Sequence, residues 1–235
     1  MSNIAIIPAR SGSKGLPGKN IKEMNGKPML SYTIEAAINS NKFNEIIVST
    51  DSSKYAELAV RYGACVPFLR NISLAQDTSS TWDAVEEVLY WYKENKNEEF
   101  STVCILQPTS PLRDSNDING AFQLFEEKKA KSVISVCEVE HSPIFSNILP
   151  ENLSMDNFIK KTEESMRRQD TEKYYRLNGA IYIRKTKEVL NKAPIYSEGT
   201  YAYIMSKENS IDIDDSIDFL FAETLMKYKE GINRD

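Results

Sequence analysis

Glycines and positive charges alternate in a loop that follows the first apolar segment of the chain. Residues 9–20 read ARSGSKGLPGKN, with three glycines, two serines and three cationic side chains. Glycine lets the backbone approach a ligand closely, and successive N–H groups in such a loop bind an anion. Open α/β sheets bind ligands at the carboxyl ends of their strands, which is where this loop begins. The residues favour a phosphate site that a triphosphate would fit; a solvated basic loop is the alternative interpretation.

Two familiar phosphate-binding motifs do not match this loop. It lacks GxGxxG, Ser13 stands where a P-loop needs its first glycine, and Gly18-Lys19 is followed by Asn20. A Rossmann dehydrogenase and a P-loop NTPase are therefore both disfavoured.

Two carboxylates near the end of the chain have a spacing that suits a metal. Asp212 and Asp214 are separated by one residue. In an extended backbone they project from the same face, about 6–7 Å apart. Mg²⁺ takes oxygen ligands and commonly binds one or two carboxylates together with substrate phosphates. Asp215 would project from the opposite face of an extended backbone, and it fits a helix N-cap. The spacing favours a magnesium site; three capping or solvated acids are the alternative.

The elements that must position these residues alternate between short β-branched runs and longer helical periods. Strands are predicted over 3–8, 45–49, 64–69, 101–107, 132–136 and 177–183. Helices are predicted over 29–40, 53–61, 78–92, 117–128 and 216–228, with Ser52 or Ser53 capping the second and Ser115 or Asn116 the fourth. This order predicts an α/β fold with a Rossmann-like, mostly parallel sheet and helices on both faces.

The segment 138–174 interrupts the alternation. It is polar, contains Pro143 and Pro150, and carries a charged run over 160–168. Several apolar residues nevertheless give it surface to bury: Phe145, Ile148, Leu149, Leu153 and Phe158. Disorder is one interpretation. We favour an excursion from a single domain spanning 1–235 that packs on another surface, such as a second subunit.

Composition excludes several classes of function. The 235 residues include 29 Lys and Arg against 34 Asp and Glu, and this net charge of −5 disfavours a nucleic-acid binder. There is no apolar run of the roughly 18 residues that a membrane span needs, and no signal-peptide pattern. The scattered Cys65, Cys104 and Cys137 fit neither a disulfide framework nor a zinc site. We expect a cytoplasmic protein without membrane or nucleic-acid partners.

Six segments occur in the order found in one enzyme family: IPARSGSKGLPGKNI (7–21), GKPML (26–30), LQPTSPLR (106–113), RRQ (167–169), RLNGAIYI (176–183) and SIDIDD (210–215). In this the chain resembles the cytidylyltransferases that activate nine-carbon α-keto sugar acids, among them the CMP-sialic acid (acylneuraminate) synthetases. The resemblance implies transfer of CMP from CTP to the sugar's anomeric hydroxyl, with Mg²⁺ as cofactor and pyrophosphate released. It also implies a nucleotide-diphospho-sugar transferase type of fold, a homodimer, and a dimerisation role for 138–174.

The resemblance further assigns nucleotide contacts. The triphosphate would lie on Arg10, Gly12, Ser13, Lys19 and Asn20. Arg10 and Lys19 would stabilise the charge that develops on the leaving pyrophosphate, and Asp212 would join them as a catalytic residue by holding the metal with Asp214. Arg70 and the hydroxyl cluster Ser79 to Thr81, with Ser80 at its centre, match cytidine-side contacts. Helix capping explains these hydroxyls equally well.

The sugar acid would meet a second set of residues: Gln107, Thr109, Ser110, Arg168, Gln169 and Asn178. Gln107 to Ser110 end the central predicted strand, where a substrate crevice is expected. By the resemblance, Arg168 binds the sugar carboxylate, which a planar guanidinium matches in bidentate fashion.

One departure concerns the identity of the sugar. Sialic acid enzymes tend to carry a lysine after a His-x-Pro-like turn, whereas EHSPIF (140–145) places Phe145 there. A less polar neighbour suits a 9-deoxy sugar of the legionaminic or pseudaminic type. A CMP-KDO synthetase and a non-catalytic sugar-nucleotide sensor are the alternatives. The GLPGKN and RLNGAIYI segments favour the nine-carbon group, and the Asp212 and Asp214 pair disfavours the sensor.

Overall fold

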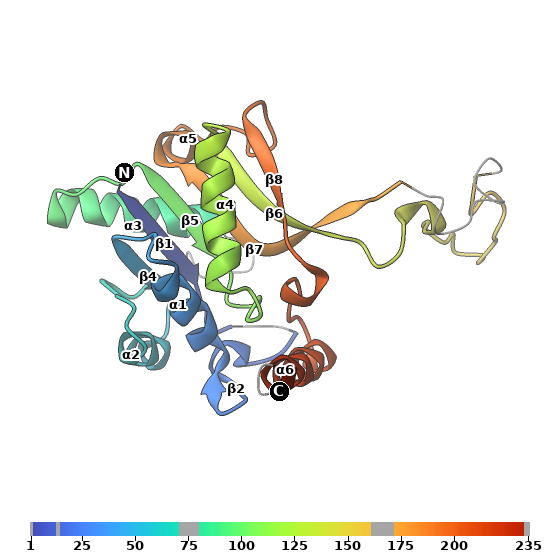
Figure 1. Ribbon diagram of the computed structural model, residues 1–235, viewed down its shortest axis with the longest axis horizontal. Helices are drawn as coiled ribbons and strands as arrows, with labels where there is room; N and C mark the ends of the chain where they lie inside the picture. Colours follow the sequence, from blue (N-terminus) through green and yellow to red (C-terminus); the bar gives the residue numbers. More distant parts are fainter. Residues whose placement is uncertain (1, 13–14, 71–79, 161–171, 233–235) are drawn as a thin grey trace.

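A six-stranded sheet organises the molecule in the computed structural model, which describes residues 2–12, 15–70, 80–160 and 172–232 (Figure 1). The strands are β1 (Asn3–Pro8), β4 (Glu45–Ser49), β5 (Thr102–Leu106), β6 (Ser132–Glu138), β7 (Tyr175–Lys185) and β8 (Thr200–Ile204). Their order is β4-β1-β5-β7-β6-β8. Every neighbouring pair is parallel except the two pairs that involve β7. The predicted mostly parallel sheet is confirmed.

Helices cover both faces of the sheet, as predicted. The helices are α1 (Met29–Ser40), α2 (Ser53–Arg61), α3 (Thr81–Lys96), α4 (Ser115–Glu127), α5 (Thr186–Leu190) and α6 (Ser216–Ile232). Residues of α1, α2 and α4 bury one face of β1 and β5, while α3 and α5 bury the other. β1 alternates accordingly, with Ala5 and Ile7 facing the first cluster and Ile4 and Ile6 the second. None of the described helices is long and apolar enough to cross a membrane.

A third apolar cluster fixes the C-terminal helix beside the first loop. Phe219, Ala222 and Met226 of α6 pack with Met24, Met29 and Leu112. Met24 belongs to a small hairpin of β2 (Glu23–Met24) and β3 (Lys27–Pro28), which follows the 3₁₀ turn η1 (Lys19–Ile21). This packing places the segment before α6 against the loop after β1.

Several local predictions need correction. The N-cap of α4 is Asp114 instead of Ser115 or Asn116; its carboxylate accepts the N–H groups of Asn116 and Asp117. The predicted strand over 64–69 reduces to a single bridge between Ile47 and Cys65. Ser52 caps α2, as one of the two predicted alternatives. β8, α5 and the hairpin were not predicted; β8 lies at the sheet edge and is mostly exposed.

The excursion leaves the body between β6 and β7. Its described parts project from the ends of these strands as an arm, on the right in Figure 1. A backbone hydrogen bond, in which Val139 N donates to Tyr174 O at 3.0 Å, closes the base of the arm. Further out the arm contains the short turn η3 (Pro143–Phe145) and strongly exposed apolar side chains, with Ile148 90% and Leu153 70% exposed.

Candidate functional site

The loop after β1 is anchored at the carboxyl end of the sheet. Ala9 N donates to Ser49 O at the end of β4, and Ser11 donates through both N and Oγ to the Asp51 carboxylate, at 2.7 and 2.9 Å. Asn20 is buried, and its Nδ2 donates to Arg10 O at 3.2 Å, which ties the two ends of the loop together. A Cβ at Gly12 would meet nothing within 4 Å, so packing among the described residues does not explain this glycine.

Lys19 joins this loop to the predicted metal carboxylates. Its Nζ donates to Ile213 O and lies 3.3 Å from Asp214 Oδ1. The loop also packs tightly here, because a Cβ on Gly15 would come within 2.4 Å of Asp214 O. The fold thus brings together two motifs that lie 194 residues apart in the sequence.

Asp212 points into the fold, whereas the Asp214 carboxylate is exposed. Ile213 N donates to Thr109 O at 2.8 Å, which fixes the segment between them against the end of β5. Burial raises the pKa of Asp212 and the Asp214 charge raises it further, while a hydrogen bond with Thr109 and the charges of Lys19 and Arg176 oppose the shift. Asp212 Oδ1 is buried and has no hydrogen-bond partner among the described residues.

This carboxylate pair fits Mg²⁺ by its chemistry. It offers oxygen donors, one of which is a buried oxygen without a partner. The described residues contain no group of three or more His, Cys, Asp or Glu that could enclose an ion. An ion held here would therefore take further ligands from substrate phosphates and water, as Mg²⁺ commonly does.

Gly179 brings β7 close to the same carboxylate. Its φ is +75°, and a Cβ there would lie 2.8 Å from Gln107 Oε1 and 3.6 Å from Asp212 Oδ2. A side chain at this position would be strained and would displace Gln107. Glycine therefore lets the Gln107 amide and the Asp212 carboxylate lie next to one backbone.

The predicted cytidine-side residues lie beside the loop. Arg70 is buried, and its Nε and Nη2 donate to Ser49 Oγ at 3.0 and 2.9 Å. Burial lowers the pKa of Arg70. The charges of Glu87 and Asp51 counter this shift, and the Arg10 charge adds to it. The two arginines are thus electrostatic neighbours. Ser80 caps α3, and it forms a reciprocal capping box with Asp83, so the capping role proposed as an alternative for this hydroxyl is present.

A cavity of about 250 Å³ adjoins Gln107. It is lined by Ser80, Thr81, Trp82, Ile105, Gln107, Tyr182, Ile195 and Tyr196. Sequence reasoning identified Ser80, Thr81 and Gln107 but missed the aromatic wall. Trp82 and Tyr182 come from α3 and β7, where aromatic residues are ordinarily assigned to the core, and Tyr196 comes from the loop after α5. Only their arrangement in space marks them as cavity residues.

Other predicted substrate residues occupy buried positions. Asn178 is 1% exposed; its Oδ1 accepts from Ser135 Oγ at 2.6 Å and its Nδ2 donates to Ser210 Oγ at 2.9 Å. These bonds hold the start of the 210–215 segment against β7. Ser110 is fully buried. The predicted Ser13, Arg168 and Gln169, and also Ser79, lie outside the described residues.

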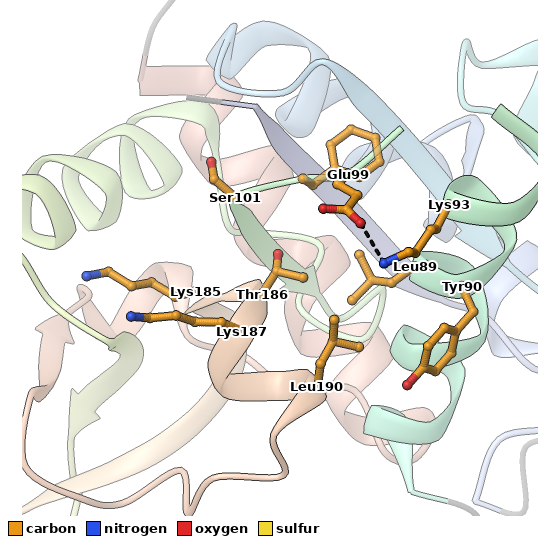
Figure 2. Close-up of a pocket in the computed structure, with 10 residues that line it drawn as sticks. Leu89, Tyr90, Lys93, Glu99, Ser101, Lys185, Thr186, Lys187 and Leu190 are labelled. Carbon is orange, nitrogen blue, oxygen red and sulfur yellow. Dashed lines mark ion pairs between the residues drawn. The ribbon is translucent and has the colours of Figure 1, made fainter. Parts of the chain in front are cut away.

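A second cavity, of about 470 Å³, lies at the opposite end of β5. Figure 2 shows Leu89, Thr186 and Leu190 along its wall and the ion pair of Lys93 Nζ with Glu99 Oε1, 2.7 Å apart. Its lining contains none of the predicted site residues. The convergence of motifs therefore singles out the carboxyl end of β1 and β5.

Comparisons with known proteins identify similar chains. The sequence model of the family described as Cytidylyltransferase matches residues 4–230. The chain is 39% identical to the CMP-N,N'-diacetyllegionaminic acid synthase of Legionella pneumophila, over 98% of each chain. It is 35% identical to the pseudaminic acid cytidylyltransferase of Campylobacter jejuni, over 97% of each.

One further sequence relative and one solved structure are also similar to this chain. The chain is 38% identical to the N-acylneuraminate cytidylyltransferase of Streptococcus agalactiae. The alignment covers 100% of this chain and 59% of that protein's length. A solved structure of CMP:2-keto-3-deoxy-manno-octonic acid synthetase complexed with CTP superposes with a TM-score of 0.72, covering 97% of this chain and 100% of that one. With 18% identity, this last likeness supports the fold alone.

Proposed function

The chain belongs to the cytidylyltransferase family, and from that premise we propose that it transfers CMP from CTP to the anomeric hydroxyl of a nine-carbon α-keto sugar acid, releasing pyrophosphate in a Mg²⁺-dependent reaction. The observation that carries this proposal is the junction of the first loop with the segment of Asp212 and Asp214, made through Lys19. A cation, two carboxylates and a glycine-rich loop at one strand end suit a triphosphate with its metal.

The triphosphate lies along the loop after β1. Arg10 and Lys19 supply fixed positive charge where the departing pyrophosphate gains negative charge, and such preorganised charge stabilises the transition state. Lys19 is held in place by Ile213 O and Asp214, so it needs little reorganisation during the reaction. Arg70, beside Arg10, marks the cytidine side.

Asp212 and Asp214 would hold the metal. When bound, Mg²⁺ neutralises phosphate charge and orients the nucleotide for attack. Asp212 must be ionised to act as a ligand, and its raised pKa makes this requirement pH-dependent.

The sugar acid occupies the cavity beside Gln107. Hydrogen bonds from the Gln107 amide orient it, while Trp82, Tyr182 and Tyr196 offer apolar faces to acyl and deoxy groups. We assign the sugar to the legionaminic or pseudaminic type. Phe145 and the relatives from Legionella and Campylobacter, which match this chain over nearly their whole length, support that assignment. Arg168 is proposed as the carboxylate contact from the sequence resemblance.

We also propose that the arm packs on a second copy of this chain, which makes the enzyme a homodimer. Its exposed Ile148, Leu153 and Met155 support this, since such apolar surface is rarely left in water. We propose a cytoplasmic location, where CTP is available to the reaction.

The transfer step is tested with CTP labelled at the α-phosphate. The label should move into a product with the mass of CMP joined to the sugar, and one pyrophosphate should appear per product. UTP and ATP should give little product. Release of labelled CMP without sugar linkage would refute transfer and indicate a hydrolase.

A further inference from the structure

A fully buried arginine ends the LQPTSPLR segment. Arg113 is 1% exposed, and its Nη2 donates to Thr33 Oγ1 on α1 at 2.8 Å. The same nitrogen lies 3.3 Å from Gln107 O and 3.5 Å from Ser110 O. One end of the guanidinium thus joins α1 to both ends of the turn that follows β5.

Stability alone does not explain an arginine at this position. Its Nε and Nη1 are buried without a hydrogen-bond partner among the described residues. Burial lowers the pKa of Arg113 to about 10, although Cys104, Asp117 and Asp114 counter part of the shift. A buried charge without close ion pairing is unfavourable, and an apolar side chain of similar volume is often as stable or more stable.

The turn that Arg113 holds is the support of the candidate site. Between the two carbonyls lies Thr109, whose own carbonyl accepts Ile213 N at 2.8 Å and which also forms a hydrogen bond with Asp212. Gln107, at the start of the turn, lines the 250 Å³ cavity. The guanidinium therefore holds the residues on either side of Thr109, the residue that contacts Ile213 and Asp212. It also holds Gln107, which lines the cavity.

We infer that Arg113 is a positioning residue, which fixes the 107–110 turn and through it aligns Asp212 with the substrate cavity. The inference rests on the proposed function and adds a residue that touches neither nucleotide nor sugar. Its role is to keep two parts of the site in register, and a displacement of about 1 Å in such a site can lower the rate about 100-fold.

The decisive variant is Arg113→Met, which keeps similar length and removes the charge. We expect an unchanged or higher melting temperature, a kcat lowered about 100-fold, and a KM for CTP within about threefold of wild type. Arg113→Lys, which retains a donor, should recover part of the kcat. A merely structural role predicts the opposite pattern, namely a lower melting temperature and activity lost in proportion to the unfolded fraction.

A milder pair of variants tests the hydrogen bond between Arg113 and Thr33 on α1. Thr33→Val removes the hydroxyl that Arg113 binds. It should lower kcat about threefold to tenfold, which is less than the loss expected for Arg113→Met because the two carbonyl contacts of Arg113 remain. Ser31→Ala is the matched control: Ser31 lies on the same helix, is fully buried, and has no side-chain hydrogen bond among the described residues. It should leave kcat unchanged. Equal kinetic losses in both variants would overturn the inference.

Hydrogen exchange gives a readout independent of turnover. The Ile213 amide should exchange at least about tenfold faster in Arg113→Met than in wild type without substrate, because its acceptor Thr109 O loses its support. Ser31→Ala should not change it. Unchanged Ile213 exchange in Arg113→Met overturns the inference. Faster exchange in a protein whose wild type shows no CMP transfer would support the positioning role and refute the proposed function.

Discussion

At the scale of single residues, Lys19 directly links the loop after β1 to the segment that carries Asp212 and Asp214. Its side chain is only 12% exposed and is directed at Ile213 O and Asp214. We expect Lys19→Met to lower kcat about 100-fold to 1,000-fold, the usual loss when one preorganised charge contact is removed. Lys22→Met, in the same turn but placed over the Phe219 ring, is the control and should retain turnover. Steady-state kinetics at saturating CTP decides; similar losses in both variants would refute the assignment.

Asp212 and Asp215 should respond to substitution in opposite ways. Asp212→Asn should lower Mg²⁺-dependent turnover at least about 100-fold, because a metal ligand is lost. Asp215 caps α6 by accepting from Ile217 N and Asp218 N. Asp215→Ala should therefore lower the free energy of unfolding by about 0.5–2 kcal/mol and keep turnover. Turnover retained in Asp212→Asn would remove Asp212 from the site.

The pH dependence of metal binding follows from the raised pKa of Asp212. For a carboxyl whose pKa is higher in the folded state, the unfolded state releases its proton first, so the metal-free fold loses stability as pH rises through that range. Mg²⁺ binding needs the ionised form, so its apparent affinity should fall as pH drops through the raised pKa. Mg²⁺ titrations across pH measure this. A flat profile in the wild type, or a pH dependence that persists in Asp212→Asn, would contradict it.

At the scale of elements, β7 is the antiparallel strand that carries Gly179 to the site. Gly179→Ala meets both a positive φ and the Gln107 side chain. We expect a loss of about 1–3 kcal/mol in unfolding free energy and a higher KM for the sugar, because Gln107 is displaced. Gly231→Ala, in α6 with nothing within 4 Å, should be neutral or slightly stabilising. Chemical denaturation and sugar titrations compare the two variants.

The strands that match their predicted ranges have side chains that are mostly buried in the sheet. β1 and β4 match their predicted ranges, since both are continuous apolar runs. The α4 cap could not be assigned because Asp114, Ser115 and Asn116 can each cap a helix, and only the backbone geometry selects Asp114. Residue type and spacing singled out the loop and the carboxylates as candidates, and the structure brings the two segments together. The cavity wall of Trp82, Tyr182 and Tyr196 was not, since tertiary packing alone brings these residues together.

At the scale of the whole molecule, the arm is the part least explained by the isolated chain. Leu153, 70% exposed, should lie in an interface between two copies. Leu153→Asp should shift the mass in solution from dimer to monomer, as read by light scattering, because a buried unpaired charge opposes association. Leu220→Asp, on the exposed side of α6, is the control and should stay dimeric. A monomeric wild type would contradict the proposed interface.

The whole arrangement is proposed to activate a nine-carbon sugar acid with CTP. The most direct measurement incubates the enzyme with CTP and Mg²⁺ and, in turn, legionaminic, pseudaminic, N-acetylneuraminic and KDO acids. Pyrophosphate release and product mass are followed together. We predict efficient formation of a CMP-sugar with a legionaminic or pseudaminic acid, weaker turnover with N-acetylneuraminic acid and none with KDO. Turnover restricted to KDO, or CTP binding without any CMP-sugar product, would refute the proposed function.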